Sequence, residues 1–124
     1  MDRVKFNKEM IKLTETHNVL SQEEQFDIMK ESIKRLDSKQ RNEISGYHNI
    51  IIVIEELGEL TKELTKALRE KEDITGILEE LGDVSIGIDY IKQIFNISNE
   101  QLEYSRSIKL SELKSKMDSN PEYS

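Results

Sequence analysis

The sequence predicts an all-α protein of one domain. Proline occurs once, at Pro121, and glycine five times in 124 residues, so few residues interrupt helices. No stretch alternates apolar and polar residues with a period of two, and no Asn-Gly or Asp-Gly pair marks a hairpin turn. Apolar residues instead recur at helical spacing. We expect residues 1–124 to form a single domain, with a helical extension over 1–43 and a core over 44–120.

Two helices are expected in the N-terminal extension. Phe6, Met10 and Leu13 indicate a short first helix. Residues 21–24, Ser-Gln-Glu-Glu, are a capping-box pattern that opens a second helix. One face of this helix carries Phe26, Met29, Ile33 and Leu36. A polar stretch over 37–43 links it to the core.

A helical hairpin forms the centre of the predicted fold. Ser45 is expected to cap a helix over about 46–69, whose apolar stripe is Ile50, Ile51, Ile54, Leu57, Thr61, Leu64 and Leu68. Residues 70–73 indicate a tight connection, with Asp73 capping a helix over about 74–96. Its expected inward residues are Ile74, Ile77, Leu78, Leu81, Val84, Ile88, Ile91 and Phe95. A capping box at 98–101 opens a last helix with Leu102, Ile108, Leu110 and Leu113.

Composition limits the class of protein. Apolar residues make up only 35% of the chain, which suggests that a partner subunit completes the core. The absence of cysteine excludes disulfides, zinc–thiolate sites, iron–sulfur clusters and thiol nucleophiles. The longest apolar run, Ile50–Ile54, is far too short for a membrane span, and the N-terminus lacks the apolar stretch of a signal peptide, so we expect a cytoplasmic protein. The net charge of −7 argues against nucleic acid as a partner.

The negative charge is concentrated in one segment. Residues 44–97 hold eleven acids and five bases, a net charge of −6, whereas the remaining residues are nearly neutral. This segment is also the most apolar part of the chain. Acids concentrated in such a segment indicate a role beyond solubility.

Two similar hexapeptides lie 24 residues apart here, Glu-Glu-Leu-Gly-Glu-Leu at 55–60 and Glu-Glu-Leu-Gly-Asp-Val at 79–84. In each, two acids at i, i+3 project from one helical face, namely Glu56 with Glu59 and Glu80 with Asp83. Like charges at this spacing repel, at a cost of roughly a few tenths of a kcal/mol per pair. A compensating cation or proton is therefore expected.

The two acid pairs are in register across the predicted hairpin. Residues at one level of two antiparallel helices have a constant sum of residue numbers, and both Glu56 with Asp83 and Glu59 with Glu80 give 139. Four carboxylates should thus meet at one level. Oxygen ligands without nearby His or Cys suit a hard cation, Mg²⁺ or Mn²⁺. A glycine lies between the acids of each motif at a cost of about 1 kcal/mol, and we expect it to allow close approach of the helices.

In these residues the chain resembles the MazG-like all-α nucleoside triphosphate pyrophosphohydrolases. The family signature is EExxE, a spacer and ExxD, which stands here at 55–59 and, after twenty residues, at 80–83. The match extends over residues 46–120. Family members often end with Lys, then Asn, then Arg followed by an aromatic residue. Lys116 and Asn120 match, whereas the arginine is absent and Tyr123 lies near its place.

The resemblance implies hydrolysis of a (deoxy)nucleoside triphosphate to the monophosphate and pyrophosphate, as house-cleaning of the nucleotide pool, by a homodimer or homotetramer. It assigns as Mg²⁺ ligands Glu56, Glu59, Glu80 and Asp83. Glu55 is expected either to order the attacking water or to bind a second metal, and Glu79 to be a structural or solvated carboxylate. Lys116 and Asn120, at i, i+4, suit phosphate or sugar oxygens. Asn49, two turns before Glu56, is expected to touch the nucleotide.

Two alternatives to the enzyme remain open at this point. One is a catalytically silent helical module that retains the bundle for oligomerisation or regulation, which the missing arginine favours. The other is an acidic bundle that binds a cation and no nucleotide. No motif in the sequence specifies the base or sugar of the substrate. The resemblance favours deoxypyrimidine or non-standard triphosphates.

Overall fold

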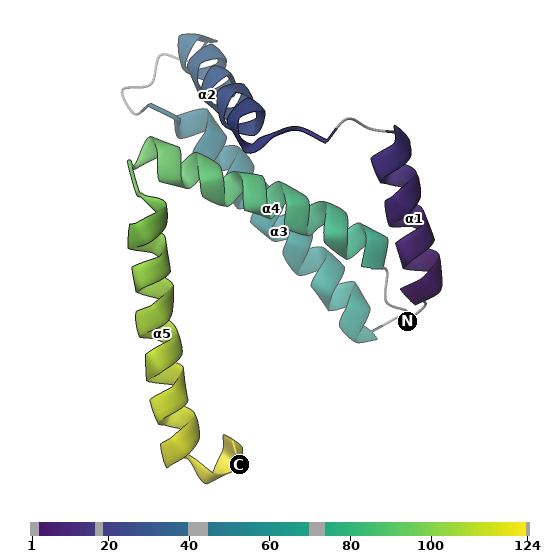
Figure 1. Cartoon of the computed structure of the whole chain (residues 1–124). Coiled ribbons are helices and arrows are strands. Elements are labelled where there is room, and N and C mark those ends of the chain that lie inside the picture. Colours follow the sequence, from purple (N-terminus) through teal and green to yellow (C-terminus); the bar gives the residue numbers. More distant parts are fainter. Residues whose placement is uncertain (1–2, 17–18, 40–44, 70–73, 124) are drawn as a thin grey trace.

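The computed structural model describes residues 3–16, 19–39, 45–69 and 74–123, which form helices and short connections without a strand (Figure 1). The elements are α1 (Arg3–Thr16), α2 (Gln22–Lys39), α3 (Tyr47–Arg69), α4 (Ile74–Ile94), α5 (Asn99–Ser119) and the short 3₁₀ helix η1 (Pro121–Tyr123). The all-α prediction is confirmed for these residues. The expected linker is helical up to Lys39, while its remainder and the connection at 70–73, with the cap Asp73, lie outside the described residues.

Both predicted capping boxes are present. The backbone N–H of Ser21 donates to Glu24 Oε1 at 3.0 Å, and the N–H of Glu24 donates to Ser21 Oγ at 3.1 Å. The hydrogen bond from the Ser21 backbone stabilises the ionised carboxylate and lowers the pKa of Glu24. At the start of α5, Ser98 and Gln101 exchange the same two bonds at 2.9 and 3.1 Å. Local sequence therefore determines where α2 and α5 begin.

The start of α3 differs from the prediction. The Ser45 hydroxyl donates to Asp37 Oδ2 at 2.7 Å, and the N–H of Gly46 donates to Asp37 Oδ1 at 2.8 Å. Gly46 has φ of 78°, and its carbonyl accepts the N–H of Ile50 at 2.9 Å, so the helix begins at Tyr47. The prediction of a Ser45 cap is wrong because a carboxylate from the end of α2 engages that hydroxyl.

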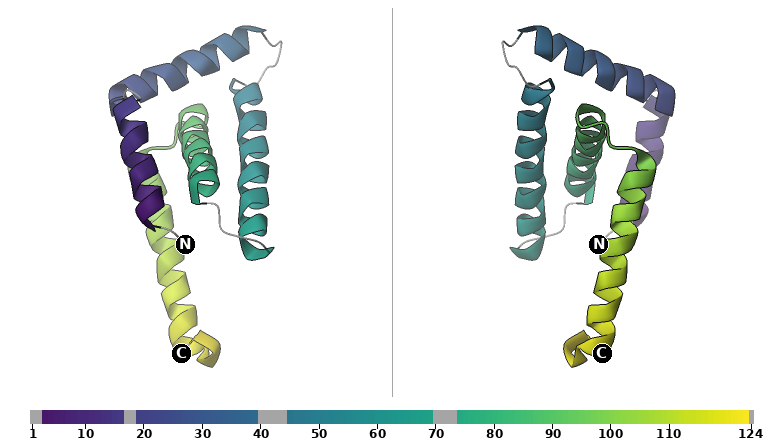
Figure 2. Two further views of the ribbon diagram at one scale, coloured as in Figure 1. Left: turned by 90° about the vertical axis from the view of Figure 1, so that its right-hand side faces the viewer. Right: turned by 90° about the vertical axis from the view of Figure 1, so that its left-hand side faces the viewer.

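α3 and α4 lie side by side and antiparallel (Figure 2). The two helices pack tightly at Gly87, where an added Cβ would lie 3.1 and 3.2 Å from the two Cγ atoms of Val53. These two residue numbers add to 140, within one residue of the register predicted from the acids. The glycines within the acidic motifs do not have the expected role, since a Cβ at Gly58 or Gly82 would meet nothing within 4 Å. The glycine that brings the helices together lies outside both motifs.

Few side chains are buried in this chain. Met29 and Val53 are the only buried apolar side chains among the described residues. Leu81, Ile88 and Phe95, expected to face inward from α4, are exposed. That prediction is wrong because, among the described elements, α3 alone packs extensively against α4. Much of the apolar surface of α4 is therefore uncovered.

The remaining helices flank the hairpin. α2 lies across the beginning of α3, and α1 stands beside the beginning of α4, where Thr75 Oγ1 donates to Glu9 Oε2 at 2.7 Å (Figure 1). At the end of α4, Asn96 adopts φ of 54° and the N–H of Ile97 donates to the Lys92 carbonyl at 2.8 Å, which ends the helix. α5 then leads away from the hairpin. None of the described helices has the length and apolarity needed to cross a membrane.

Candidate metal centre

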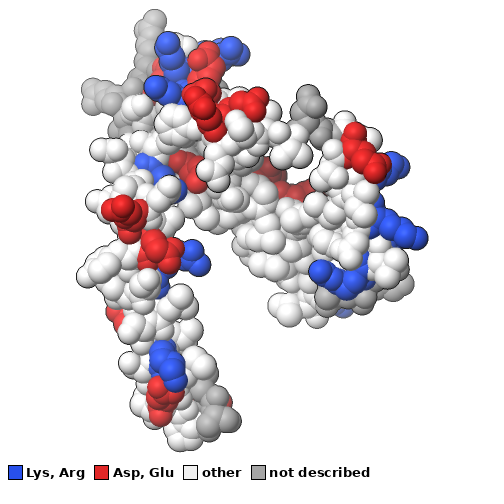
Figure 3. All heavy atoms as spheres, in the orientation of Figure 1, with Lys and Arg blue, Asp and Glu red and all other residues white. Residues whose placement is uncertain are grey.

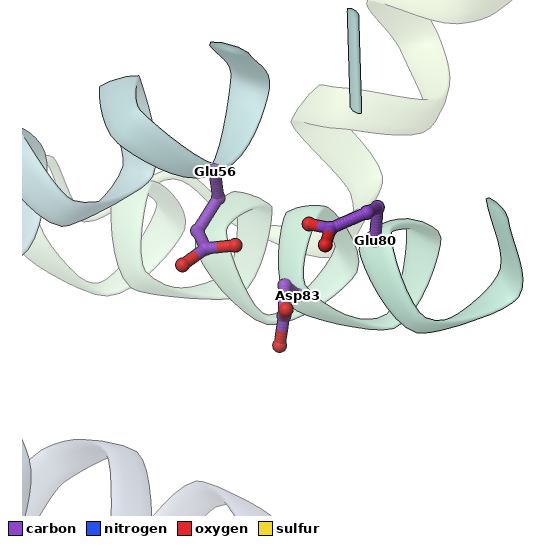
Figure 4. A group of neighbouring side chains, drawn as sticks. All are labelled: Glu56, Glu80 and Asp83. Carbon is purple, nitrogen blue, oxygen red and sulfur yellow. The ribbon is translucent and has the colours of Figure 1, made fainter. Parts of the chain in front are cut away.

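Three carboxylates converge where α3 and α4 face each other. Glu56 lies one turn after Val53 on α3, and Glu80 and Asp83 lie one turn apart on α4. One ligand atom from each of Glu56, Glu80 and Asp83 lies within 4.8 Å of the others. Figure 4 shows the Glu56 side chain pointing from α3 toward the two acids of α4. We call these three residues the carboxylate triad.

Simultaneous ionisation of the three triad carboxylates is unfavourable in the absence of a cation. Desolvation raises the pKa of Glu56, and the Asp83 charge, a hydrogen bond with Asp83, and the charges of Glu80 and Glu59 raise it further. Desolvation also raises the pKa of Glu80, together with the charges of Asp83, Glu59 and Glu63, while a hydrogen bond with Glu56 acts in the opposite direction. Both shifts have the same two main causes, first the desolvation of the carboxylate and then repulsion from the neighbouring acids.

The triad has the chemistry of a hard-cation site. Glu80 Oε2 is buried and has no hydrogen-bond partner in the described part of the chain. A buried carboxylate oxygen without a donor is unfavourable, and a bound cation would satisfy it. Mg²⁺ commonly binds few protein carboxylates and completes its octahedral shell with water and phosphate oxygens. The donor set of the triad is compatible with Mg²⁺ or Mn²⁺, which stay a prediction.

The other acids of the two motifs lie outside the triad. Glu59, the fourth predicted ligand, is exposed and does not belong to the group within 4.8 Å, although its charge acts on Glu56 and Glu80. Glu55 and Glu79 are also exposed. The structure thus brings together three of the four predicted ligands and places the fourth close enough to influence the pKa of two of them.

Asn49 occupies a different environment from the one expected of a nucleotide ligand. It is buried to 1% exposure between α3 and α2, and its Nδ2 donates to Ser32 Oγ at 3.4 Å. Its Oδ1 is buried without a hydrogen-bond partner in the described structure. Asn49 precedes Glu56 by two helical turns, as predicted, but it lies within the contact between two helices.

Lys116 and Asn120 lie away from the carboxylate triad in this chain. Lys116 is exposed in the last turn of α5, and Asn120 ends that helix, with its Oδ1 accepting the N–H of Glu122 at 3.0 Å. The last turns of α5 are the part of that helix farthest from the α3/α4 hairpin (Figure 1). The predicted helical face does not extend to Asn120, because α5 ends at Ser119 and Asn120 is extended, with φ of −115° and ψ of 115°. The structure also does not bring the two residues to the triad.

Sequence reasoning did not identify Glu63 as part of this electrostatic cluster. Glu63 lies seven residues after Glu56 on α3, is partly buried, and forms an ion pair with Lys66 at 3.7 Å. Its charge contributes to the raised pKa of Glu80. The i, i+7 spacing from Glu56 was the available signal, because two heptad-spaced residues share a helical face.

A cavity of about 790 Å³ also lies between α2, the end of α4 and the start of α5. Its lining includes Phe26, Met29 and Ile33 from α2, Lys92 and Gln93 from α4, and Asn99 from α5. Gln93 Nε2 is buried without a hydrogen-bond partner among the described residues. Gln93 follows Asp83 by ten residues on α4, which is about 15 Å along the helix. No sequence motif marks this cavity, since its residues come from three separate helices.

Comparison of the chain with models of known families, with curated proteins and with solved structures finds no match.

Proposed function

We propose that this chain hydrolyses a (deoxy)nucleoside triphosphate to the monophosphate and pyrophosphate in the presence of Mg²⁺ or Mn²⁺. The observation that carries the proposal is the convergence of Glu56, Glu80 and Asp83, from two helices, within 4.8 Å. The order and spacing of these acids resemble those of MazG-like pyrophosphohydrolases. This resemblance is the basis for the proposed reaction.

The residues have separate roles in the proposed reaction. Glu56, Glu80 and Asp83, with Glu59 beside them, would hold the cation, which would neutralise charge on the phosphate oxygens. Water adds to the α-phosphorus, and the bond to the oxygen bridging the α- and β-phosphates breaks to release pyrophosphate. Glu55, one residue before Glu56 on the same helix, either orders this water or binds a second cation.

The cavity beneath α2 is the proposed place for the nucleoside. Phe26 and Ile33 offer apolar surface for a base, and Gln93 and Asn99 offer amide groups for its polar edge. A triphosphate that bridges the cavity and the triad would run along α4. Because Lys116 and Asn120 lie far from the triad in one chain, their proposed contact with phosphate requires α5 of another subunit in a homodimer or homotetramer.

Pyrophosphate release from a panel of nucleoside and deoxynucleoside triphosphates tests the proposal. Glu80→Gln and Asp83→Asn should each lower kcat/KM by at least about 100-fold, since loss of residues that merely support a metal ligand already costs 10–100-fold. Glu79→Gln is the matched control, because Glu79 is the neighbouring glutamate and lies outside the triad. Equal activity of Glu80→Gln and the wild-type protein would refute the assignment. The panel also identifies the base and sugar.

A catalytically silent module is the second candidate, and one observation favours it: within the chain, the phosphate-binding candidates on α5 lie away from the triad. Thermal melting with Mg²⁺ and a non-hydrolysable triphosphate separates the candidates. A ligand at 100 times its Kd should stabilise the native state by about 2.7 kcal/mol. Stabilisation by both Mg²⁺ and the triphosphate supports the enzyme. Stabilisation by Mg²⁺ alone supports an acidic bundle that binds a cation. If neither ligand stabilises the protein, the silent module is supported.

A further inference from the structure

Several polar side chains that line the cavity beneath α2 already have a partner within the chain. Gln25 Nε2 donates to the Leu20 carbonyl at 3.1 Å, and the Ser45 hydroxyl donates to Asp37 at 2.7 Å. Ser98 caps α5. A ligand that bonded to these groups would have to break an internal hydrogen bond, so they contribute little to recognition.

Three further lining residues bind one another. Lys92 Nζ lies 3.7 Å from Asp89 Oδ1 and also donates to Asn99 Oδ1, so this chain of contacts joins the end of α4 to the first residue of α5. The charges of Lys92 and Asp89 offset each other. On the face drawn in Figure 3, acidic and basic side chains are also mixed over α2 and α5. The cavity wall formed by α4 and α5 is therefore suited to an uncharged group such as a nucleobase.

Gln93 differs from these residues. It is partly buried on α4, and its Nε2 is buried without a hydrogen-bond partner among the described residues. The side chains of Gln22 and Asn96 also line the cavity, but they are exposed, so water can satisfy them. A buried amide nitrogen without an acceptor destabilises the empty protein, and a ligand that supplies an acceptor removes this cost. Gln93 is therefore the lining side chain that gains most from a polar ligand.

Gln93 also lies on the face of α4 that leads away from the carboxylate triad. One helical stripe, with intervals of three, four and three residues, contains Asp83, Ile86, Tyr90 and Gln93. Between the two ends of this stripe, Ile86 is 45% exposed and Tyr90 is partly exposed. A nucleotide with its phosphates at the triad would cover these two side chains and present its base to Gln93, which lies about 15 Å further along α4.

We propose that Gln93 binds the hydrogen-bonding edge of the nucleobase and accepts bases that carry either a carbonyl or an amino group there. The inference rests on the proposed function, because it takes the ligand to be a nucleotide. A carboxamide donates to the carbonyl and accepts the ring N–H of uracil, thymine or guanine. After rotation about its terminal bond, the same carboxamide accepts from the amino group and donates to the ring nitrogen of cytosine or adenine.

The environment of Gln93 leaves both orientations of its amide open. No hydrogen bond to Nε2 fixes the amide in one of them in the described structure. The cavity, of about 790 Å³, is large enough for a purine as well as a pyrimidine. The substrate class is therefore a broad set of nucleoside triphosphates, defined more by their phosphates than by one base. This class is wider than the deoxypyrimidine or non-standard triphosphates that the sequence resemblance favours.

Calorimetric titration of the full chain with dUMP, dCMP, dGMP and dAMP, in the presence of Mg²⁺, tests the role of Gln93 without turnover. The four dissociation constants of the wild-type protein should agree within about tenfold. Gln93→Glu retains only hydrogen-bond acceptors, so the ratio of the dUMP to the dCMP dissociation constant should rise at least about tenfold. Gln22→Glu is the matched control, because it adds the same charge to the α2 wall of the cavity and should leave this ratio unchanged.

The inference is overturned by an unchanged ratio in Gln93→Glu, by an equal shift in Gln22→Glu, or by a wild-type protein that binds one base alone or none at millimolar concentration. If Gln93→Glu loses the helical circular dichroism, the side-chain amide signal of Gln93 in NMR spectra of the wild-type protein decides, since it should shift with both dUMP and dCMP. Turnover of triphosphates with a base ratio unaffected by Gln93→Glu refutes the role of Gln93 alone. Base binding through Gln93 without turnover refutes the proposed enzyme alone.

Discussion

Glu80, a proposed cation ligand, destabilises the folded chain when it is ionised and no cation is bound. One of its oxygens is buried without a hydrogen-bond partner in the described structure, and its pKa is raised by desolvation and by Asp83, Glu59 and Glu63. Each feature destabilises the ionised form in the folded state unless a cation is present. A residue of this kind is expected where a protein sacrifices stability for a binding site.

The substitution Glu80→Gln should raise the melting temperature of the metal-free protein by a few degrees at pH 7.5 and abolish its stabilisation by Mg²⁺. The raised pKa of Glu80 means that the native wild-type protein binds this proton more tightly than the unfolded chain. Its stability therefore falls as pH rises from about 4.3, the ordinary glutamate value, through the raised pKa. The difference between variant and wild type should be near zero at pH 4.3 and positive at pH 7.5 in urea denaturation.

The control for this prediction is Glu79→Gln. Glu79 is exposed and outside the triad, so its substitution should keep both the Mg²⁺ stabilisation and the wild-type pH dependence. If Glu80→Gln is instead less stable than wild type at pH 7.5 without metal, the electrostatic description of the triad is wrong.

At the scale of the element, the α3/α4 hairpin is aligned by a small residue and not by the acidic motifs. Gly87 admits the Val53 side chain, and this contact places Glu56 one turn away, level with Asp83. The hairpin thus aligns the triad through apolar packing next to it. This explains why carboxylates that repel one another can be held together in the apoprotein.

Gly87→Ala should destabilise the protein by about 1–3 kcal/mol, because its Cβ would crowd both Cγ atoms of Val53. Gly82→Ala, in the same helix but facing open space, should stabilise it by up to about 1 kcal/mol and serves as the matched control. Chemical denaturation measures both. Equal effects of the two substitutions would show that the helices do not approach at Gly87.

Ser98→Ala should weaken α5 by about 1 kcal/mol through loss of the capping box, which is about a fivefold loss of amide protection. Because α5 makes few contacts with the hairpin, the loss should be confined to α5 in hydrogen exchange and should spare the amides of α3. Ser105→Ala, at an exposed mid-helix position, should cause no loss of protection. Equal loss in α3 would mean that α5 and the hairpin unfold as one unit.

At the scale of the whole molecule, the described residues expose many large apolar side chains and bury few. Two apolar side chains are buried among the described residues, while large apolar side chains on α3, α4 and α5 are exposed, among them Ile54, Leu57, Leu81, Ile88 and Leu110. A buried core of this size is small for a chain of this length. If the proposed association of subunits adds to the buried apolar surface, the stability of the folded state depends on protein concentration.

The melting temperature of the wild-type protein should rise with protein concentration across the micromolar range, because association stabilises the native state by mass action. Calorimetry over a hundredfold range of concentration measures this dependence. A wild-type melting temperature independent of concentration would contradict coupled folding and association.

The elements of the chain were predictable from local sequence. Capping at Ser21 and Ser98 involves residues three positions apart, so the motif contains all the atoms that determine the helix start. The antiparallel register of the acids was predictable for a similar reason, since helical spacing and a short connection determine which positions are level. The convergence of Glu56 with Asp83 follows from both.

Tertiary structure alone decided which helical face is covered and which distant groups meet. α3 is apolar on two sides, and the sequence does not show which side packs on α4. In the structure the side with Val53 packs there, because Gly87 leaves room for the Val53 side chain. Asp37 engages Ser45, and Asn49 is enclosed by α2, because contacts across connections depend on where whole helices lie. The path of α5 separates Lys116 from the triad for the same reason. Local sequence thus determined the helices and the triad, whereas the packing of the helices decided what surrounds the triad and what surface remains for a partner.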